Sequence, residues 1–156
     1  MNRKALTRGE AVVFYTADPK DNPEYTHLIE SIESDGRLRD GEKEMLEYTV
    51  ETIFGIGYSI YDHLYFHTHD MMKVMDVKSA LMTADRYETK MIQAVKNEIL
   101  PIVFQRAYLY AQSHGSSQAY IFWVKKLQEN ALKIMQYNKR GVSILKNKNH
   151  ISSSGL

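Results

Sequence analysis

The sequence predicts a mainly helical bundle with a short strand near its C-terminus. Apolar side chains recur every three or four residues in several segments, which is the spacing of one helix face. Glycines and side chains that cap helices separate these segments, as "SDGRLRDG" does at 34–41. No internal repeat or low-complexity segment interrupts the pattern. The expected helices cover 24–34, 41–54, 59–66, 70–82, 86–113 and a last helix that continues to about 139.

The first two helices each carry one apolar face. Leu28, Ile29 and Ile32 are spaced for helix 24–34, and Met45, Leu46, Val50 and Ile53 form the stripe of helix 41–54. Asp40 is the expected N-cap of the second helix, and "GIG" at 55–57 is expected to end it. The aromatic segment "SIYDHLYF" (59–66) suits a short third helix, although it would also suit a strand.

Capping residues and one proline divide the second half of the chain. Asp70 is the expected N-cap of helix 70–82, and Asp85 with Glu88 forms a capping-box pattern that opens helix 86–113. Pro101 lacks a backbone donor, so it should kink or divide that helix near Leu100. Gly115 is expected to end it. Ser116 then caps the last helix, Gly141 closes it, and "VSIL" (142–145) resembles a strand.

Four regions follow from this order. Residues 1–23 form an arm, because "TADPKDNPEY" is a cluster of turn residues with little to pack. Residues 24–84 form a helical domain, 85–140 a helical hairpin for oligomerisation, and 141–156 a strand and tail.

Composition favours a soluble, intracellular protein. Of its 156 residues, 44% are hydrophobic and 25% are charged, and none is cysteine, which excludes disulfides and thiol chemistry. No apolar run approaches the about 18 residues of a membrane span. Residues 11–51 contain 4 basic and 11 acidic side chains, whereas 52–156 contain 13 basic and 7 acidic. A chain divided in this way can offer an acidic face to one partner and a basic face to another.

No pattern in the sequence indicates catalysis strongly. Asp62, His63, His67, His69 and Asp70 could bind a divalent ion, which leaves a metal-dependent enzyme open as an alternative to a polar turn. His114 lies near Ser116, but the G-x-S-x-G elbow of serine hydrolases is missing, and "GIG" is no phosphate loop. The sequence therefore predicts no catalytic residue, no bound metal and no cofactor.

The segment 59–84 is compatible with a helix-turn-helix. In that interpretation "HTHD" (67–70) is the turn and the second helix carries Lys73 and Lys78, with Arg86 and Lys90 continuing the basic side. An ordinary helical hairpin is the alternative.

The region 85–126, "DRYETKMIQAVKNEILPIVFQRAYLYAQSHGSSQAYIFWVKK", resembles the central part of bacteriophage small terminase subunits. In that family a long alanine-containing helix leads through a short Gly-Ser/Thr turn to a helix that opens with a run similar to "AxIFWLK". The matching residues here are Ala107, Ala111, Gly115, Ser116, Ser117, Ala119, Ile121, Phe122, Trp123, Val124 and Lys125.

The resemblance implies a DNA-packaging protein without enzymatic activity, in the cytoplasm of the host. Such a protein forms a homo-oligomeric ring, binds double-stranded viral DNA and regulates the large terminase subunit, which is the ATPase and nuclease. The expected DNA contacts are Arg3, Lys4, Arg8, Lys73, Lys78 and Arg86. The expected subunit interface contains Phe104, Tyr108, Tyr120, Phe122, Trp123 and Leu127.

One alternative does not need DNA. A structural connector or regulatory protein of a phage could use the same Tyr- and Met-rich helices to bind a protein partner.

Overall fold

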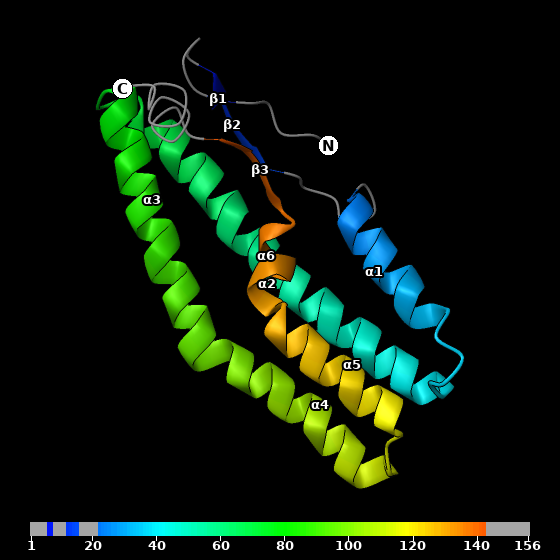
Figure 1. Ribbon diagram of the computed structural model, residues 1–156. Coiled ribbons are helices and arrows are strands. Elements are labelled where there is room, and N and C mark those ends of the chain that lie inside the picture. Colours follow the sequence, from blue (N-terminus) through cyan, green and yellow to red (C-terminus); the bar gives the residue numbers. More distant parts are fainter. Residues whose placement is uncertain (1–5, 8–11, 16–21, 143–156) are drawn as a thin grey trace, which may run out of the picture.

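The mainly helical prediction is confirmed. The computed structural model describes residues 6–7, 12–15 and 22–142 (Figure 1). The elements in chain order are β1 (Leu6–Thr7), β2 (Val12–Tyr15), α1 (Pro23–Glu33), α2 (Asp40–Met71), α3 (Val77–Ala94), the π-helical segment η2 (Val95–Ile99), α4 (Leu100–His114), α5 (Gln118–Glu129), α6 (Ala131–Gln136) and β3 (Lys139–Val142).

Helix α2 is the central element of the fold. Its buried face carries Leu46, Ile53, Phe54, Tyr61 and Leu64, which are no more than 1% exposed. Helices α1, α3, α4, α5 and α6 all contact α2, and Figure 1 shows α5 lying between α2 and α4. One continuous hydrophobic core therefore joins helices from both sides of residue 84.

The predicted helix end at 55–57 is wrong, because α2 passes through both glycines without interruption. Gly57 is buried where the backbone of α6 crosses, and a Cβ atom there would overlap the backbone carbonyl of Met135. Gly55 has nothing within 4 Å of a Cβ atom. The glycine at 57 thus permits close approach of two helices, which a single sequence cannot distinguish from a helix end.

The predicted turn at 67–70 is also wrong. Those residues belong to the last turn of α2, so the connection to α3 lies at 72–76 and Asp76, not Asp70, is the N-cap. The Asp76 side chain accepts a hydrogen bond from the Ser79 N–H at 2.8 Å. Helices α2 and α3 lie side by side as a helical hairpin (Figure 1).

The capping box predicted at Asp85 and Glu88 does not exist, since α3 runs through both residues. The Glu88 carboxylate instead turns inward, where it accepts hydrogen bonds from the Tyr61 hydroxyl at 2.7 Å and from the Lys139 ammonium at 2.9 and 3.0 Å. This contact ties the start of β3 to α2 and α3.

Pro101 disturbs the long helix as expected, although by a π-helical segment instead of a sharp break. The Leu100 N–H donates to the Val95 carbonyl, five residues back, and α4 begins there. The chain bends between α3 and α4 (Figure 1). Proline cannot donate to the helical ladder and clashes with the preceding turn, and the wider π turn accommodates both effects.

Gly115 ends α4 as predicted, with φ of 64° in the left-handed region. Ser117, and not Ser116, caps α5 by accepting the Tyr120 N–H at 3.1 Å. The expected single last helix is divided at Asn130 into α5 and α6.

A small antiparallel sheet joins the two ends of the described chain in the order β1–β2–β3. Val12 pairs with Val142, and Tyr15 pairs with Lys139. The strand expected at 142–145 lies outside the described residues except for Val142, the last residue of β3. The described part of the predicted arm contributes β1 and β2.

Candidate functional site

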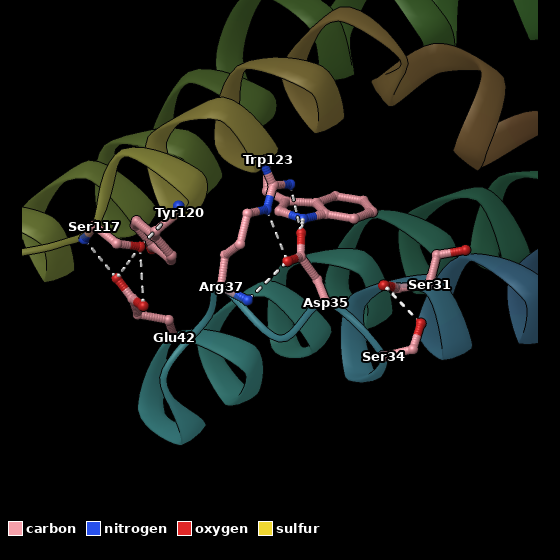
Figure 2. Close-up of polar contacts among 8 residues, drawn as sticks. All are labelled: Ser31, Ser34, Asp35, Arg37, Glu42, Ser117, Tyr120 and Trp123. Carbon is pink, nitrogen blue, oxygen red and sulfur yellow. Dashed lines mark hydrogen bonds and ion pairs between the residues drawn. The ribbon is translucent and has the colours of Figure 1, made fainter.

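The starts of two helices, α2 and α5, meet at the buried carboxylate of Glu42 (Figure 2). Glu42 is 2% exposed and accepts the Arg39 N–H at 2.8 Å, which caps its own helix. It also accepts the Ser117 N–H at 2.8 Å and the Ser117 hydroxyl at 3.0 and 3.1 Å, at the start of α5. Burial raises the pKa of Glu42, but the hydrogen bonds from Arg39 and Ser117 outweigh it, so its pKa lies below the usual range.

A second polar contact fastens the loop between α1 and α2 to α5. The Trp123 indole N–H donates to Asp35 Oδ2 at 2.8 Å, and Arg37 donates to both carboxylate oxygens at 2.9 and 2.7 Å (Figure 2). Hydrogen bonds lower the pKa of Asp35: the bond from the Arg37 side chain has the largest effect, and the bond from the Trp123 indole has the next largest. Through Ser117 and Trp123, the two contacts join the start of α5 to the start of α2 and to the loop before it.

We expect stability to fall in acid partly because of Asp35. Its pKa is lowered in the folded chain, so its contribution is complete above about pH 4 and is lost as the pH falls through its folded pKa. Urea unfolding at several values between pH 3 and pH 6 should show a shallower decline for Asp35→Asn than for the wild type. An equal decline in both proteins would contradict this assignment.

A row of basic side chains runs along the outer face of α3. Lys78, Arg86 and Lys90 are exposed and lie eight and four residues apart, which places them on one side of the helix over about 18 Å. Two acidic residues lie within this segment: Tyr61 and Lys139 occupy the carboxylate of Glu88, whereas Asp85 is exposed and lies seven residues from Lys78, on the same side of the helix. We call Lys78, Arg86 and Lys90 the α3 basic row.

The structure brings together only two of the six predicted DNA contacts. Lys78 and Arg86 belong to the α3 basic row, whereas Lys73 lies in the turn before α3 and pairs with Asp70 at 3.4 Å. Lys78 is close enough to Asp76 to lower the pKa of that carboxyl, after the larger effect of the Ser79 hydrogen bonds. The other three predicted contacts, Arg3, Lys4 and Arg8, lie outside the described residues.

Four of the six predicted interface residues are buried inside the chain's own core. They are Phe104, Tyr120, Trp123 and Leu127. The Tyr120 hydroxyl donates to the Ala107 carbonyl at 2.7 Å, so these residues join α4 to α5 within one chain. Tyr108 is half-buried and donates to Gln128, and Phe122 is 56% exposed. Of this set, Phe122 is the side chain that a neighbouring molecule can reach directly.

An apolar surface that the sequence analysis missed lies on the outer side of α4. Ile99, the last residue of η2, and Ile102 and Leu109 of α4 are 42%, 59% and 51% exposed, whereas Val103, Phe104 and Ala107 of α4 are buried. Arg106 lies in the same row, with its guanidinium 5.1 Å from the Tyr48 ring centroid and hydrogen-bonded to the Tyr48 hydroxyl. We call Ile99, Ile102, Arg106 and Leu109 the α4 row. The separation of these residues by three, four and three positions in the sequence could have revealed the α4 row.

The histidine cluster does not assemble into a metal site in the part of the chain that the structure describes, where no three acidic or histidine side chains converge. The rings of His63 and His67 are stacked with their centroids 5.8 Å apart, and the rings of His67 and Tyr87 form a T-shaped pair. The side chain of His69 points to a different side of α2 from that of His67, because two residues along a helix correspond to a rotation of about 200° about its axis.

Among the residues described, none of the helices has the length and apolar character needed to cross a bilayer. A comparison with known proteins adds no family: no protein-family model matches the chain, and neither a curated protein nor a solved structure is significantly similar to it.

Proposed function

We propose that this chain is a non-enzymatic, self-associating protein that binds the backbone of double-stranded DNA, in the role that small terminase subunits have in viral DNA packaging. The observation that carries the proposal is the α3 basic row, three exposed cations on one helix face. Lysine and arginine in such a row neutralise phosphates and release counterions from DNA.

The proposed contact is to phosphates and not to bases. A helix-turn-helix presents its second helix to the major groove across a short turn, whereas here the expected turn at 67–70 is part of α2. Phosphate contacts position a protein on DNA without selecting a sequence. Recognition of a particular packaging site would therefore need other residues or another subunit.

The distribution of acidic side chains supports one orientation on DNA. Exposed carboxylates gather on α1 and on the first half of α2: Glu24, Glu30, Glu33, Asp40, Glu44 and Glu51. Figure 1 shows α1 and α3 on opposite flanks of α2. DNA would repel the α1 side and attract the α3 side.

The proposal also includes the assembly in which such a protein acts. Several copies of the chain would form a ring, and a large terminase subunit would be its partner in the host cytoplasm.

The α4 row favours a second candidate function, a phage connector or regulatory protein that acts by binding protein. Exposed aliphatic side chains on one helix face are typical of an interaction surface and contribute nothing to phosphate binding. The two functions differ in whether DNA is bound at all.

Binding to a duplex labelled with a fluorophore, measured by anisotropy between 50 and 200 mM salt, tests the proposal. Three phosphate contacts predict a slope of about −2.7 for log K against log salt concentration. Arg86→Ala and Lys90→Ala should each weaken binding and reduce the slope by about 1.

Lys125→Ala and Lys133→Ala are matched controls, since they remove the same charge from exposed positions on α5 and α6. They should leave the slope unchanged. Absence of binding at low salt, a salt-independent affinity, or equal losses in the control variants would each refute DNA binding by α3.

A further inference from the structure

Helix α3 has its buried side chains near its two ends. Ala80 and Leu81 lie close to its start, Val95 directly follows it, and all three are buried. In the described stretch between Leu81 and Val95, about 21 Å of helix, no side chain is fully buried. Met91 and Ile92 are half-buried there and pack at the edge of the core. Apolar burial alone therefore holds the middle of α3 only weakly against α2.

A polar contact lies in the middle of this stretch. The Glu88 carboxylate accepts hydrogen bonds from the Tyr61 hydroxyl at 2.7 Å and from the Lys139 ammonium at 2.9 and 3.0 Å. The side chains of Glu88 and Lys139 are 15% and 30% exposed, so water screens their charges only in part. Hydrogen bonds between charged groups in such a place are stronger than those of an exposed ion pair.

Both partners of Glu88 are fixed by contacts that do not involve α3. Tyr61 lies in the middle of α2 and is inaccessible to solvent. Lys139 follows Asn138, whose buried side-chain amide donates to a backbone carbonyl of α2 at 2.9 Å, and the backbone of Lys139 pairs with β2. Elements other than α3 therefore position the hydroxyl and the ammonium that Glu88 meets.

We propose that the ion pair between Glu88 and Lys139 is a latch that holds the middle of α3 closed on α2. When the latch is broken, this part of α3 opens while the rest of the core stays folded. The chain bends at both ends of α3, in the turn at 72–76 and in η2, and these bends can take up the movement (Figure 1). Because Lys139 is the first residue of β3, the closed position of α3, and of the α3 basic row, depends on the sheet.

Native-state hydrogen exchange of the full chain, with DNA absent, tests the latch. In the wild type the amides of 83–93 should exchange faster than the core amides of α2, and with little dependence on urea, because local opening exposes little surface. Lys139→Met keeps the aliphatic stem but removes the charge, so it should speed this exchange about tenfold or more. Lys133→Met is the matched control: it removes the same charge from an exposed position on α6 and should leave α3 unchanged.

A second substitution shows whether the two charges act on each other. Glu88→Gln keeps the size of the side chain and an acceptor for the Tyr61 hydroxyl, but it removes the carboxylate charge. If the ion pair is the latch, Glu88→Gln and Lys139→Met should each speed exchange in 83–93, and the double variant should exchange no faster than the faster single variant. Circular dichroism of all variants checks that the helices remain intact.

Three results would each overturn the latch. They are exchange of 83–93 only together with the core of α2, additive effects of Glu88→Gln and Lys139→Met, and an equal gain in Lys133→Met. Since DNA is absent from the measurement, the latch and the proposed function can fail separately. A chain that opens as expected but binds no duplex would refute the proposed function alone, whereas a chain that binds duplex through α3 without local opening would refute the latch alone.

Discussion

Gly57→Ala is expected to lower the free energy of unfolding by about 3 kcal/mol, the upper end of the usual cost of overpacking. The added methyl group would overlap the Met135 carbonyl, which belongs to the backbone and cannot rotate away. Helix α6 would have to move off α2, and Met135 and Ile134, both nearly inaccessible to solvent, would lose contacts. Urea unfolding followed by the fluorescence of Trp123, the single tryptophan, measures the change.

Gly55→Ala is the matched control, because the same change two residues earlier meets open space. Alanine is the better helix former, so this variant should gain about 0.5–1 kcal/mol in the free energy of unfolding. Losses of similar size in both variants would mean that α6 does not cross α2 at Gly57.

Glu42→Ala is expected to cost about 3 kcal/mol. It removes the acceptor for the Arg39 and Ser117 N–H groups and for the Ser117 hydroxyl at one buried point. Each backbone donor left without a partner costs about 1–3 kcal/mol, to the extent that water cannot replace the carboxylate. The measurement is again urea unfolding, at pH 7.

Glu44→Ala is the control for this variant, since Glu44 is an exposed glutamate two residues along the same helix. Its effect should stay within about 0.5 kcal/mol. A small effect of Glu42→Ala would show that the starts of α2 and α5 do not depend on a shared acceptor.

The helical class was predictable because apolar spacing along the chain is a local property. Ile32, Leu46, Val50 and Ile53 were assigned to core faces from spacing alone, and all four are fully buried. Gly115 and Pro101 also acted where expected, because a left-handed residue and a missing backbone donor have local effects. Local chemistry is what a single sequence records best.

Helix boundaries that depend on distant contacts were not predictable. Gly57 lies within a helix because the backbone of Met135 approaches it closely, and Glu42 is buried because it accepts hydrogen bonds from Ser117. Each of these partners is more than 70 positions away in the sequence. Glu88 fits a capping box in sequence, yet its partners are Tyr61 and Lys139. For the same reason the predicted interface residues Phe104, Tyr120, Trp123 and Leu127 proved to be internal, since an apolar face does not tell whether its own chain or another covers it.

The position of α2 at the centre of the fold determines when the chain can fold during synthesis. Its buried face is covered chiefly by helices made much later, and Asn22, which caps α1, donates to the Tyr137 carbonyl 115 residues further on at 2.8 Å. The ribosome therefore releases α1 and α2 well before α5 and α6 emerge to cover them. Until then Leu46, Ile53, Tyr61 and Leu64 stay open to water and to chaperones, so we expect the native state to form only after almost the whole helical region has been translated.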